Sequence, residues 1–309
     1  MTLAAFTNPG RFWRGNLHTH SDRSDGVLPP EEVCRRYRAE GYDFLALTDH
    51  FVGLYDYPIT DTTGYRRDDF TTILGAELHS GAMENGEIWH VLAVGLPSDF
   101  ARPNAPHFFT VEDQETGPEI AARARAAGAF VAIAHPQWSG MTLNDARSIT
   151  EAHAVEIYNH GCAVECDRPD GFHTLDLLLS EGRRLTLCAT DDAHFAGPDF
   201  FGGWVMVKAE ENSPEALLSA LTSGAFYSSQ GPEIHDIRIE DDHVIVESSA
   251  VSTLVVAGQG SAAGAVHGAS MTRAPMPLDR FEASPWIRVT VVDAAGRRAW
   301  ANPIWFEDL

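Results

Sequence analysis

Short apolar segments alternate with amphipathic segments over the first two thirds of the chain. The apolar segments have the length of β-strands, and proline near the start and glycine at the end mark several of the others as helices. The predicted strands are residues 13–18, 43–48, 71–76, 87–96, 129–134, 154–158, 184–189 and 203–209. The predicted helices are residues 29–38, 112–127, 142–149, 173–182 and 213–222. This alternation is typical of an α/β protein built from β/α units around a parallel sheet or barrel.

The pattern changes after residue 230. Segments 234–247, 252–258 and 286–306 alternate apolar and polar residues and are separated by turns, which indicates strands without intervening helices. Residues 262–274, rich in glycine and alanine, are expected to form a surface loop. We therefore predict an α/β domain over residues 1–230 and a small all-β, sandwich-like domain over residues 231–309.

Composition and charge narrow the classes of partner. The chain has 309 residues, 44% of them hydrophobic, and can bury a sizeable core. Its formal net charge of −22 argues against nucleic acid and anionic membranes, since both attract clustered Lys and Arg. No apolar run reaches the roughly 20 residues that span a bilayer, and residues 1–14 lack the regions of a secretory signal. We expect a cytoplasmic protein with a small-molecule substrate and make no prediction of its oligomeric state.

The four cysteines show two patterns. Cys34 and Cys188 lie in apolar segments and are expected to be buried. Cys162 and Cys166 are four residues apart and close to His160, which fits either half of a zinc site or free thiols in a loop. Because no second cysteine pair follows, free thiols are the favoured interpretation.

Histidine and acidic residues recur where the predicted strands end. His18 and His20 are two apart on one strand, so both side chains point to the same side and can bind one ion. Taken alone, Asp25 before Gly26 fits a turn and Asp192 fits a helix N-cap. Ligands bind at the carboxyl ends of strands in α/β folds, so the whole set is expected to converge. It comprises His18, His20, Asp25, His50, Glu77, His90, His135, Asp192 and His194.

Nine imidazoles and carboxylates exceed the needs of one ion. They suit two or three divalent ions, with Glu77 as a bridging carboxylate. Six of the fourteen histidines belong to this set, and the other eight, His79 among them, are expected to be solvated or structural.

The motifs that contain these residues have a recognisable order. They are His18-Thr19-His20, Ser24-Asp25-Gly26, Leu47-Thr48-Asp49-His50, Gly75-Ala76-Glu77, His90, Ala134-His135-Pro136 and Asp192-Ala193-His194. In type and order they resemble the PHP (polymerase and histidinol phosphatase) family of metal-dependent hydrolases, over about residues 13–229. The resemblance implies a distorted barrel of seven β/α units that holds two or three Zn, Mn or Fe ions. Segment 231–306 resembles the C-terminal β domain of the carbaryl-hydrolase-like branch.

The resemblance also implies three sets of ligands. His18, His20, Glu77 and Asp192 would hold a first metal, and Glu77, His90 and His135 a second. Asp25, His50 and His194 would hold a third. Asp25 stands where some relatives have histidine, and a hard oxygen ligand favours Mn or Fe at that site.

The function implied is hydrolysis by a metal-bridging hydroxide, since paired ions lower the pKa of a shared water to about 7. The favoured reaction is that of a phosphoesterase acting on a small phosphorylated molecule. The same ions would also serve a hydrolase of a carbamate, amide or carboxylic ester, and a non-catalytic, metal-stabilised binding module is the third alternative. No protein side chain is assigned as the nucleophile. The candidates for substrate contact are Arg23, Gln137, Asn159 and His160.

Overall fold

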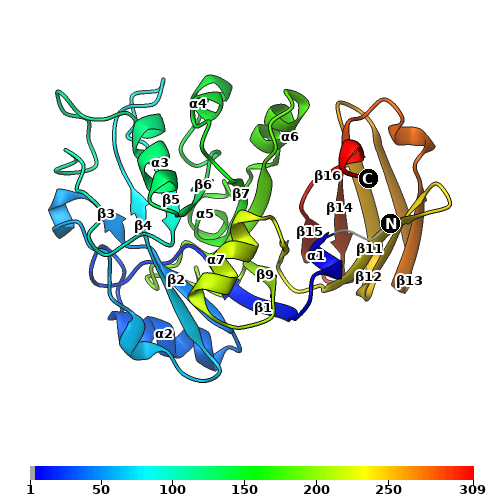
Figure 1. Ribbon diagram of the computed structural model, residues 1–309, viewed down its shortest axis with the longest axis horizontal. Coiled ribbons are helices and arrows are strands. Elements are labelled where there is room, and N and C mark those ends of the chain that lie inside the picture. Colours follow the sequence, from blue (N-terminus) through cyan, green and yellow to red (C-terminus); the bar gives the residue numbers. More distant parts are fainter. Residues whose placement is uncertain (1–3) are drawn as a thin grey trace.

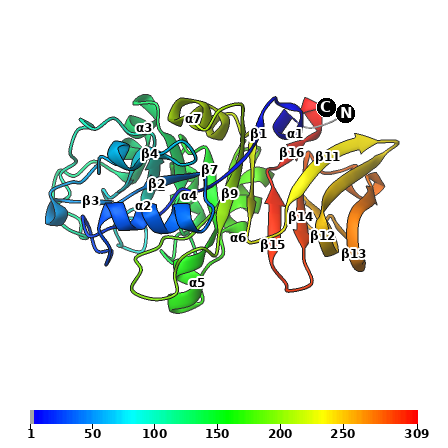
Figure 2. The same ribbon diagram turned by 90° about the horizontal axis from the view of Figure 1, so that it is seen from below.

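The computed structural model describes residues 4–309 and has two lobes (Figure 1). An α/β lobe contains the chain up to about β10, and the C-terminal strands form a second lobe beside it. The short helix α1 lies against the second lobe in both views, so the two ends of the described chain are close together (Figure 2). No helix within residues 4–309 is both long and apolar enough to cross a membrane.

The element order follows the predicted alternation in the α/β lobe. The strands are β1 (Arg11–Asn16), β2 (Phe44–Leu47), β3 (His50–Phe51), β4 (Thr71–Leu78), β5 (Val91–Val94), β6 (Phe130–Ile133), β7 (Ala154–Asn159), β8 (Thr186–Thr190), β9 (Trp204–Ala209), β10 (Phe226–Ser229), β11 (Ile234–Glu240), β12 (His243–Gly258), β13 (Ala263–Pro277), β14 (Trp286–Val292), β15 (Arg298–Ala301) and β16 (Ile304–Trp305). The α-helices are α1 (Ala4–Thr7), α2 (Pro30–Ala39), α3 (Gly117–Ala126), α4 (Leu143–Ser148), α5 (His160–Cys166), α6 (Phe172–Ser180) and α7 (Pro214–Thr222). Short 3₁₀ turns occupy Gly53–Tyr55, Thr63–Tyr65, Asp279–Phe281 and Phe306–Asp308.

Local signals explain where the helices begin. Proline stands in the first turn of α2, α3 and α7, where its missing N–H removes no helical hydrogen bond. Thr116 and Glu119 form a reciprocal capping box at the start of α3, and Thr142 and Asp145 do the same for α4. These side chains satisfy backbone N–H groups that would otherwise lack partners.

The α/β lobe is one curved, mixed sheet in the order β9-β1-β2-β4-β5-β6-β7-β8. Strand β5 is antiparallel to both β4 and β6, and β9 is antiparallel to β1, whereas the remaining neighbours in this series are parallel. The predicted barrel of seven β/α units is therefore not confirmed. Among the described residues β8 has no backbone ladder to β1 or β9. The two margins are joined by the isolated Thr19–Ala193 bridge, by hydrogen bonds from Asp191 N to Asn16 Oδ1 and from Asp192 N to the His18 carbonyl, and by Ser228.

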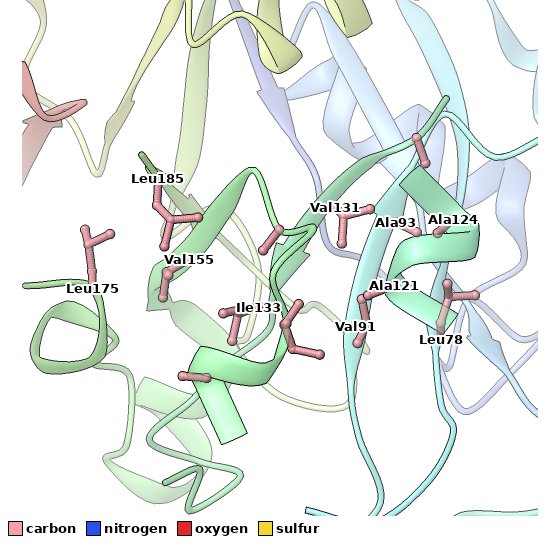
Figure 3. Packing of buried hydrophobic residues seen from close by; sticks show 14 of the residues in the cluster. Leu78, Val91, Ala93, Ala121, Ala124, Val131, Ile133, Val155, Leu175 and Leu185 are labelled. Carbon is pink, nitrogen blue, oxygen red and sulfur yellow. The ribbon is translucent and has the colours of Figure 1, made fainter. Parts of the chain in front are cut away.

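Helices cover the outer face of this sheet with apolar contacts. Leu78, Val91 and Ile133 on neighbouring strands pack against Ala121 and Ala124 of α3 (Figure 3). Leu175 of α6 belongs to the same cluster further along the sheet. Each of these side chains is 0–1% exposed. This packing anchors the strands whose ends carry the polar residues.

The C-terminal lobe is antiparallel and is joined to the first lobe by a continuous sheet. Strand β12 pairs with β11, β13 and β14, and β14 pairs with β15 and β16. Strand β15 in turn pairs with β10, which neighbours β9 of the α/β lobe. The predicted boundary at residues 230/231 falls between β10 and β11. A division into two domains at that point stays a prediction.

Side chains also tie the lobes together. Arg288 of β14 donates two hydrogen bonds of 2.8 Å to the carboxylate of Asp176 on α6. The side chain of Asn302 accepts a hydrogen bond from Leu187 N on β8. Trp300 is buried in the same apolar cluster as the α/β strands. The C-terminal lobe therefore buttresses the outer side of β7, β8 and α6.

Three local predictions were wrong or incomplete. The expected loop 262–274 is most of strand β13, whose residues are largely exposed because β13 lies at an edge and pairs only with β12. Most side chains of β13 are exposed, so its sequence lacks the regular alternation of apolar and polar residues that reveals a half-buried strand. Strand β10 and helix α5 were also not expected. Helix α5 begins where the Asn159 side chain accepts a hydrogen bond from Cys162 N.

Candidate metal centre

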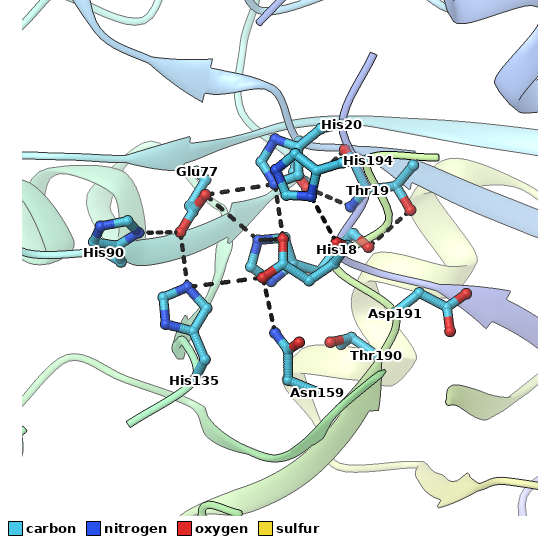
Figure 4. A network of polar contacts seen from close by, with 12 residues as sticks. His18, Thr19, His20, Glu77, His90, His135, Asn159, Thr190, Asp191 and His194 are labelled. Carbon is cyan, nitrogen blue, oxygen red and sulfur yellow. Dashed lines mark hydrogen bonds and ion pairs between the residues drawn. The ribbon is translucent and has the colours of Figure 1, made fainter. Parts of the chain in front are cut away.

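The nine predicted ligands come from several separate segments and lie close together. Figure 4 shows six of them, His18, His20, Glu77, His90, His135 and His194. His18 and His20 follow β1, and His135 follows β6. The parallel pairing of β3 with β4 sets His50 directly opposite Glu77. His90 precedes β5, which runs antiparallel to the strand that carries Glu77. The Thr19–Ala193 bridge brings the segment after β8, with Asp192 and His194, against His18 and His20.

Glu77 is at the centre of the cluster and is fully buried. Its Oε1 lies 2.6 Å from His90 Nδ1 and 3.1 Å from His135 Nε2. Its Oε2 lies 3.5 Å from His18 Nε2, 3.6 Å from His20 Nε2 and 2.7 Å from His50 Nδ1. Each carboxylate oxygen thus faces a different group of imidazoles, which is the arrangement a bridging ligand requires.

Two further groups flank Glu77. Asp192 Oδ1 lies 2.9 Å from His20 Nε2 and 3.2 Å from His18 Nε2, which completes the first predicted set. Asp25 lies 3.3 Å from both His50 Nε2 and His194 Nε2, which are the members of the third set. His20 belongs to both groups by distance, because its Nδ1 is 4.0 Å from Asp25.

His79 belongs to the cluster although the sequence analysis treated it as solvated or structural. It is fully buried, and its Nε2 lies 2.9 Å from His50 Nδ1 and 3.8 Å from Glu77 Oε2. Its Nδ1 lies 3.1 Å from the carbonyl oxygen of Trp89. With Nδ1 donating to that carbonyl, Nε2 is left as the acceptor for the His50 N–H. The alternation along β4 could have signalled this, since His79 is two residues from Glu77 and faces the same side.

A second layer of buried polar groups orients the ligands. Glu156 Oε1 lies 3.0 Å from His18 Nδ1, so that Nδ1–H donates to Glu156 and Nε2 is directed at the cluster. Glu156 Oε2 accepts hydrogen bonds from the backbone N of His135 and from the Asn159 side chain. Asn159 also donates to Asp192 Oδ2 at 3.0 Å. Such carboxylate–histidine pairs behind a metal ligand fix its tautomer and raise its basicity.

Burial and neighbouring charges shift the pKa values of the cluster residues in different directions. Burial opposes charge on Glu77, but cationic neighbours led by His50 and His90 outweigh it and hold the Glu77 pKa well below its usual range. Burial likewise opposes protonation of His50, yet the carboxylates of Glu77 and Asp25 raise its pKa to about 10. For His20, burial and neighbouring imidazoles lower the pKa to about 4. The site therefore mixes imidazoles that hold a proton with others that do not.

Two buried atoms of the predicted ligands are among those that lack a hydrogen-bond partner in the described part of the chain. His18 Nε2 and Glu77 Oε2 form no hydrogen bond of acceptable geometry with any residue in the described range 4–309. They lie 3.5 Å apart and face each other. Burying unpaired polar atoms costs about 1–3 kcal/mol each, and a cation between a neutral imidazole nitrogen and a carboxylate oxygen would satisfy both. The donor set of imidazoles and carboxylates fits Zn, Mn or Fe.

Residues 16–184 match the sequence model of the PHP domain, which is more than half of the chain. The chain belongs to the PHP domain family. No curated protein matches the sequence.

Solved structures of similar fold include members described as phosphoesterases. A two-domain protein of Bacteroides vulgatus, described as containing a predicted PHP-like metal-dependent phosphoesterase, is 18% identical, covers 89% of this chain and 87% of its own, and has a TM-score of 0.54. An amidohydrolase of Chromobacterium violaceum with bound sulfate and no metal is 15% identical, covers 58% and 87%, and has a TM-score of 0.43. The first of these, described as a two-domain protein, has a fold similar to that of this chain over most of both chains.

Two of the predicted ligands have unusual backbone conformations. His135 and Asp192 have φ angles of 23° and 55°, in the region that non-glycine residues rarely adopt. Backbone strain of this kind concentrates at functional sites, where surrounding contacts hold it in place. Gly26 permits another close approach, because a Cβ there would lie 2.7 Å from the carbonyl carbon of His20. This contact folds the loop that carries Asp25 back over the histidines.

The four predicted substrate residues lie in different surroundings. Arg23 is exposed, with one loose contact of 3.9 Å to its neighbour Asp22. The Gln137 side chain accepts a hydrogen bond from the backbone N of Asp170. Asn159 is fully buried and engaged behind the ligands, and His160 Nδ1 contacts the Tyr158 hydroxyl at 2.9 Å. Substrate contact by these residues stays a prediction.

The cysteines do not join the PHP site. Cys162 and Cys166 lie on α5, and the groups within residues 4–309 that are spaced to hold a metal contain neither of them. All four cysteines are free, and Cys166 is exposed. Free thiols are confirmed, but Cys162 and Cys166 lie on a helix and not in a loop.

Proposed function

We propose that this protein is a metal-dependent phosphoesterase that acts on a small phosphorylated molecule. The observation that carries the proposal is the position of Glu77. Its two oxygens face two groups of imidazoles, and one of them remains without a hydrogen bond in the described part of the chain. Membership of the PHP family supports the same conclusion.

Three sets of residues would each hold one ion. His18, His20, Asp192 and Glu77 would hold the first ion, Glu77, His90 and His135 the second, and Asp25, His50 and His194 the third. Glu156 holds a proton on His18 Nδ1, and Ser139 contacts His135 Nδ1 at 3.0 Å, so the Nε2 atom of each ring is directed inward. Ions bound here would activate water and neutralise charge on the phosphoryl oxygens. Ions held by the third set would depend on the exposed loop that carries Asp25.

A basic side chain near the candidate metal centre favours an anionic substrate over a neutral one. Arg168, which the sequence analysis did not consider, lines the same pocket as His90. A guanidinium recognises phosphate and carboxylate through paired N–H donors and has no matching role toward a neutral ester or amide. The net charge of −22 makes a polyanionic nucleic acid a poor substrate and supports a small molecule.

The test is metal titration of chelator-treated protein with p-nitrophenyl phosphate as the probe. We expect turnover to be absent without metal and to rise until about two equivalents of Mn²⁺, Zn²⁺ or Fe²⁺ are bound. A Glu77→Gln preparation made in the same way controls for contaminating phosphatases. Metal content is measured in parallel by elemental analysis.

The competing functions give different results in the same experiment. Metal-dependent cleavage of p-nitrophenyl acetate or an aryl carbamate, without cleavage of the phosphate, would replace the proposal with an ester or carbamate hydrolase. Stoichiometric metal binding without turnover of any of these probes would replace it with a metal-stabilised binding module.

A further inference from the structure

A pocket of about 440 Å³ lies beside the second predicted ligand set. His90 forms part of its wall, so the pocket borders the candidate metal centre. Met83, Ile88 and Trp138 add apolar surface, and Arg168 and Glu87 add one charge of each sign. Asn85 and Ser139 also line the pocket, so its wall is mixed, and its volume lies in the range of about 300–1,000 Å³ that is typical of small-molecule sites.

Trp138 connects the pocket to the predicted ligands. Its ring centroid lies 4.8 Å from that of His135 and 5.3 Å from that of His90, and the residue is 41% exposed. Both contacts are edge-to-face, so the indole is held in a fixed orientation by rings that are themselves fixed. An exposed tryptophan held in this way offers a rigid surface on which a planar group can stack.

Arg168 supplies a charge that the protein itself does not use. Its backbone N donates to the carbonyl of Cys162, and the preceding residue, Asp167, ends α5 with a φ of 57°. The backbone position of Arg168 is therefore set by the end of the helix. Over residues 4–309 its guanidinium forms no hydrogen bond and no ion pair. In a protein with twice as many acidic as basic residues, an arginine left free beside a pocket is available for an anion.

We propose that this pocket binds the part of the substrate beyond the reacting phosphate, and that this part is a planar ring bearing an anionic substituent. The ring would stack on Trp138 between Met83 and Ile88, and the anion would pair with Arg168. This inference rests on the proposed phosphoesterase function and names its substrate class. The anionic substituent can be a carboxylate or a second phosphate, since Arg168 recognises both.

The test compares three aryl phosphates on the metal-loaded, full-length protein. They are phenyl phosphate, 4-carboxyphenyl phosphate and 1,4-phenylene bisphosphate. We expect the two that carry a second anion to have a kcat/KM about five- to tenfold higher than phenyl phosphate, mainly through KM, as for a partly exposed charged contact. The carboxylate and bisphosphate arms show which anion the pocket prefers.

Two variants that change the charge of the pocket in opposite directions make the test specific. Arg168→Met should abolish the preference for the second anion, whereas Glu87→Gln should increase it by about twofold because a like charge is removed from the wall. Arg35→Met is the matched control, since Arg35 pairs with Glu32 on the exposed face of α2. An unchanged preference in Arg168→Met, or no preference in the wild type, would overturn the inference.

A binding measurement separates this inference from the proposed function. Ligand-observed NMR compares the affinity of 4-hydroxybenzoate and phenol for the chelator-treated protein. Tighter binding of 4-hydroxybenzoate that is lost in Arg168→Met supports the pocket even if no phosphate ester is cleaved, in which case only the proposed function fails. Equal binding of the two probes by the wild type counts against the pocket, whatever the outcome with phosphate esters.

Discussion

The candidate metal centre and the C-terminal lobe bury different kinds of side chain. In the C-terminal lobe the buried side chains are almost all apolar, and Val256, Val289 and Phe281 are each 0–1% exposed. At the metal centre His18 and Glu77 are just as buried, although they are ionisable. Burial stabilises the first group through the hydrophobic effect and penalises the second through lost hydration.

The comparison indicates that the candidate metal centre, rather than the C-terminal lobe, depends on bound ions. Most buried polar groups of the C-terminal lobe, such as Ser284, are hydrogen-bonded within it, and Trp286 Nε1 is the one buried side-chain nitrogen or oxygen of its described residues that has no partner. The metal centre retains unpaired buried atoms and imidazoles with opposed protonation preferences. We infer that ions stabilise the α/β lobe and that the C-terminal lobe is insensitive to them.

The largest effect is expected from removing the negative charge of Glu77 at the centre of the cluster. Glu77→Gln should lower kcat/KM for p-nitrophenyl phosphate by about 10²–10³-fold or more, because a neutral amide cannot bridge two cations. Elemental analysis should show fewer than two ions per chain, and circular dichroism should show an intact fold. Glu282→Gln, an exposed position next to β14, is the control and should match the wild type. Full activity of Glu77→Gln would contradict the bridging role.

Changing the layer behind the ligands should have a smaller effect. Glu156→Gln keeps the volume of the side chain but weakens the acceptor for His18 Nδ1, so the affinity for the first ion should fall by about 10–100-fold. Competition with a chromogenic chelator measures this affinity. Activity should return at saturating metal, which distinguishes a positioning residue from a ligand. An unchanged affinity would show that Glu156 does not support His18.

As pH rises, the stability of the metal-free protein should fall and its affinity for metal should rise. In the metal-free protein the pKa of His50 is about 10 and that of His194 about 9, raised by carboxylates against the effect of burial. Because these values exceed the unfolded value of about 6.5, the stability they contribute is present below pH 6.5 and is lost as pH rises through 9–10. Metal must displace these protons, so metal affinity should rise by about tenfold per pH unit for each proton released.

Calorimetry in two buffers of different ionisation enthalpy counts the protons released on metal binding. Thermal unfolding between pH 6 and pH 10 gives the stability of each form. The melting temperature of the metal-free protein should fall over this range more than that of the metal-loaded protein. Metal binding without proton release would contradict the raised pKa values.

The smallest effect is expected from a change in the core of the C-terminal lobe. Ile237→Val in β11 removes one methylene group from the core of the C-terminal lobe and should cost about 0.5–1.5 kcal/mol of unfolding free energy. Metal affinity and kcat/KM should not change. Denaturant unfolding with and without metal measures the cost, which should be the same in both. A change in metal affinity would mean that the two lobes are coupled.

Much of the α/β lobe was predictable because its strands are buried and short. Strands β2, β6 and β7 lie within the predicted segments 43–48 and 129–134 or within one residue of 154–158, since an apolar run bounded by polar residues marks a buried strand. The edge strand β13 was missed because pairing along one side leaves most of its residues in solvent. A closed barrel was expected from family resemblance, and only coordinates could show how the margins of the sheet meet.

The supporting residues of the site were less accessible to sequence reasoning. Glu156 stands between Val155 and Ile157 in a buried strand, which signals a charge that needs a partner but does not say which one. His79 carried a signal in its two-residue spacing from Glu77. Arg168 carried none, because its role depends on a pocket formed by segments about 30 and 80 residues away in the chain.

The amino-acid sequence by itself determined the chemical types and the order of the nine predicted ligands, and local periodicity placed most of them near the ends of strands. The tertiary structure alone decided that Glu156 orients the His18 ring and that a pocket lies beside His90. These contacts join residues far apart in the chain. Their distances depend on how the sheet curves, which no local pattern encodes.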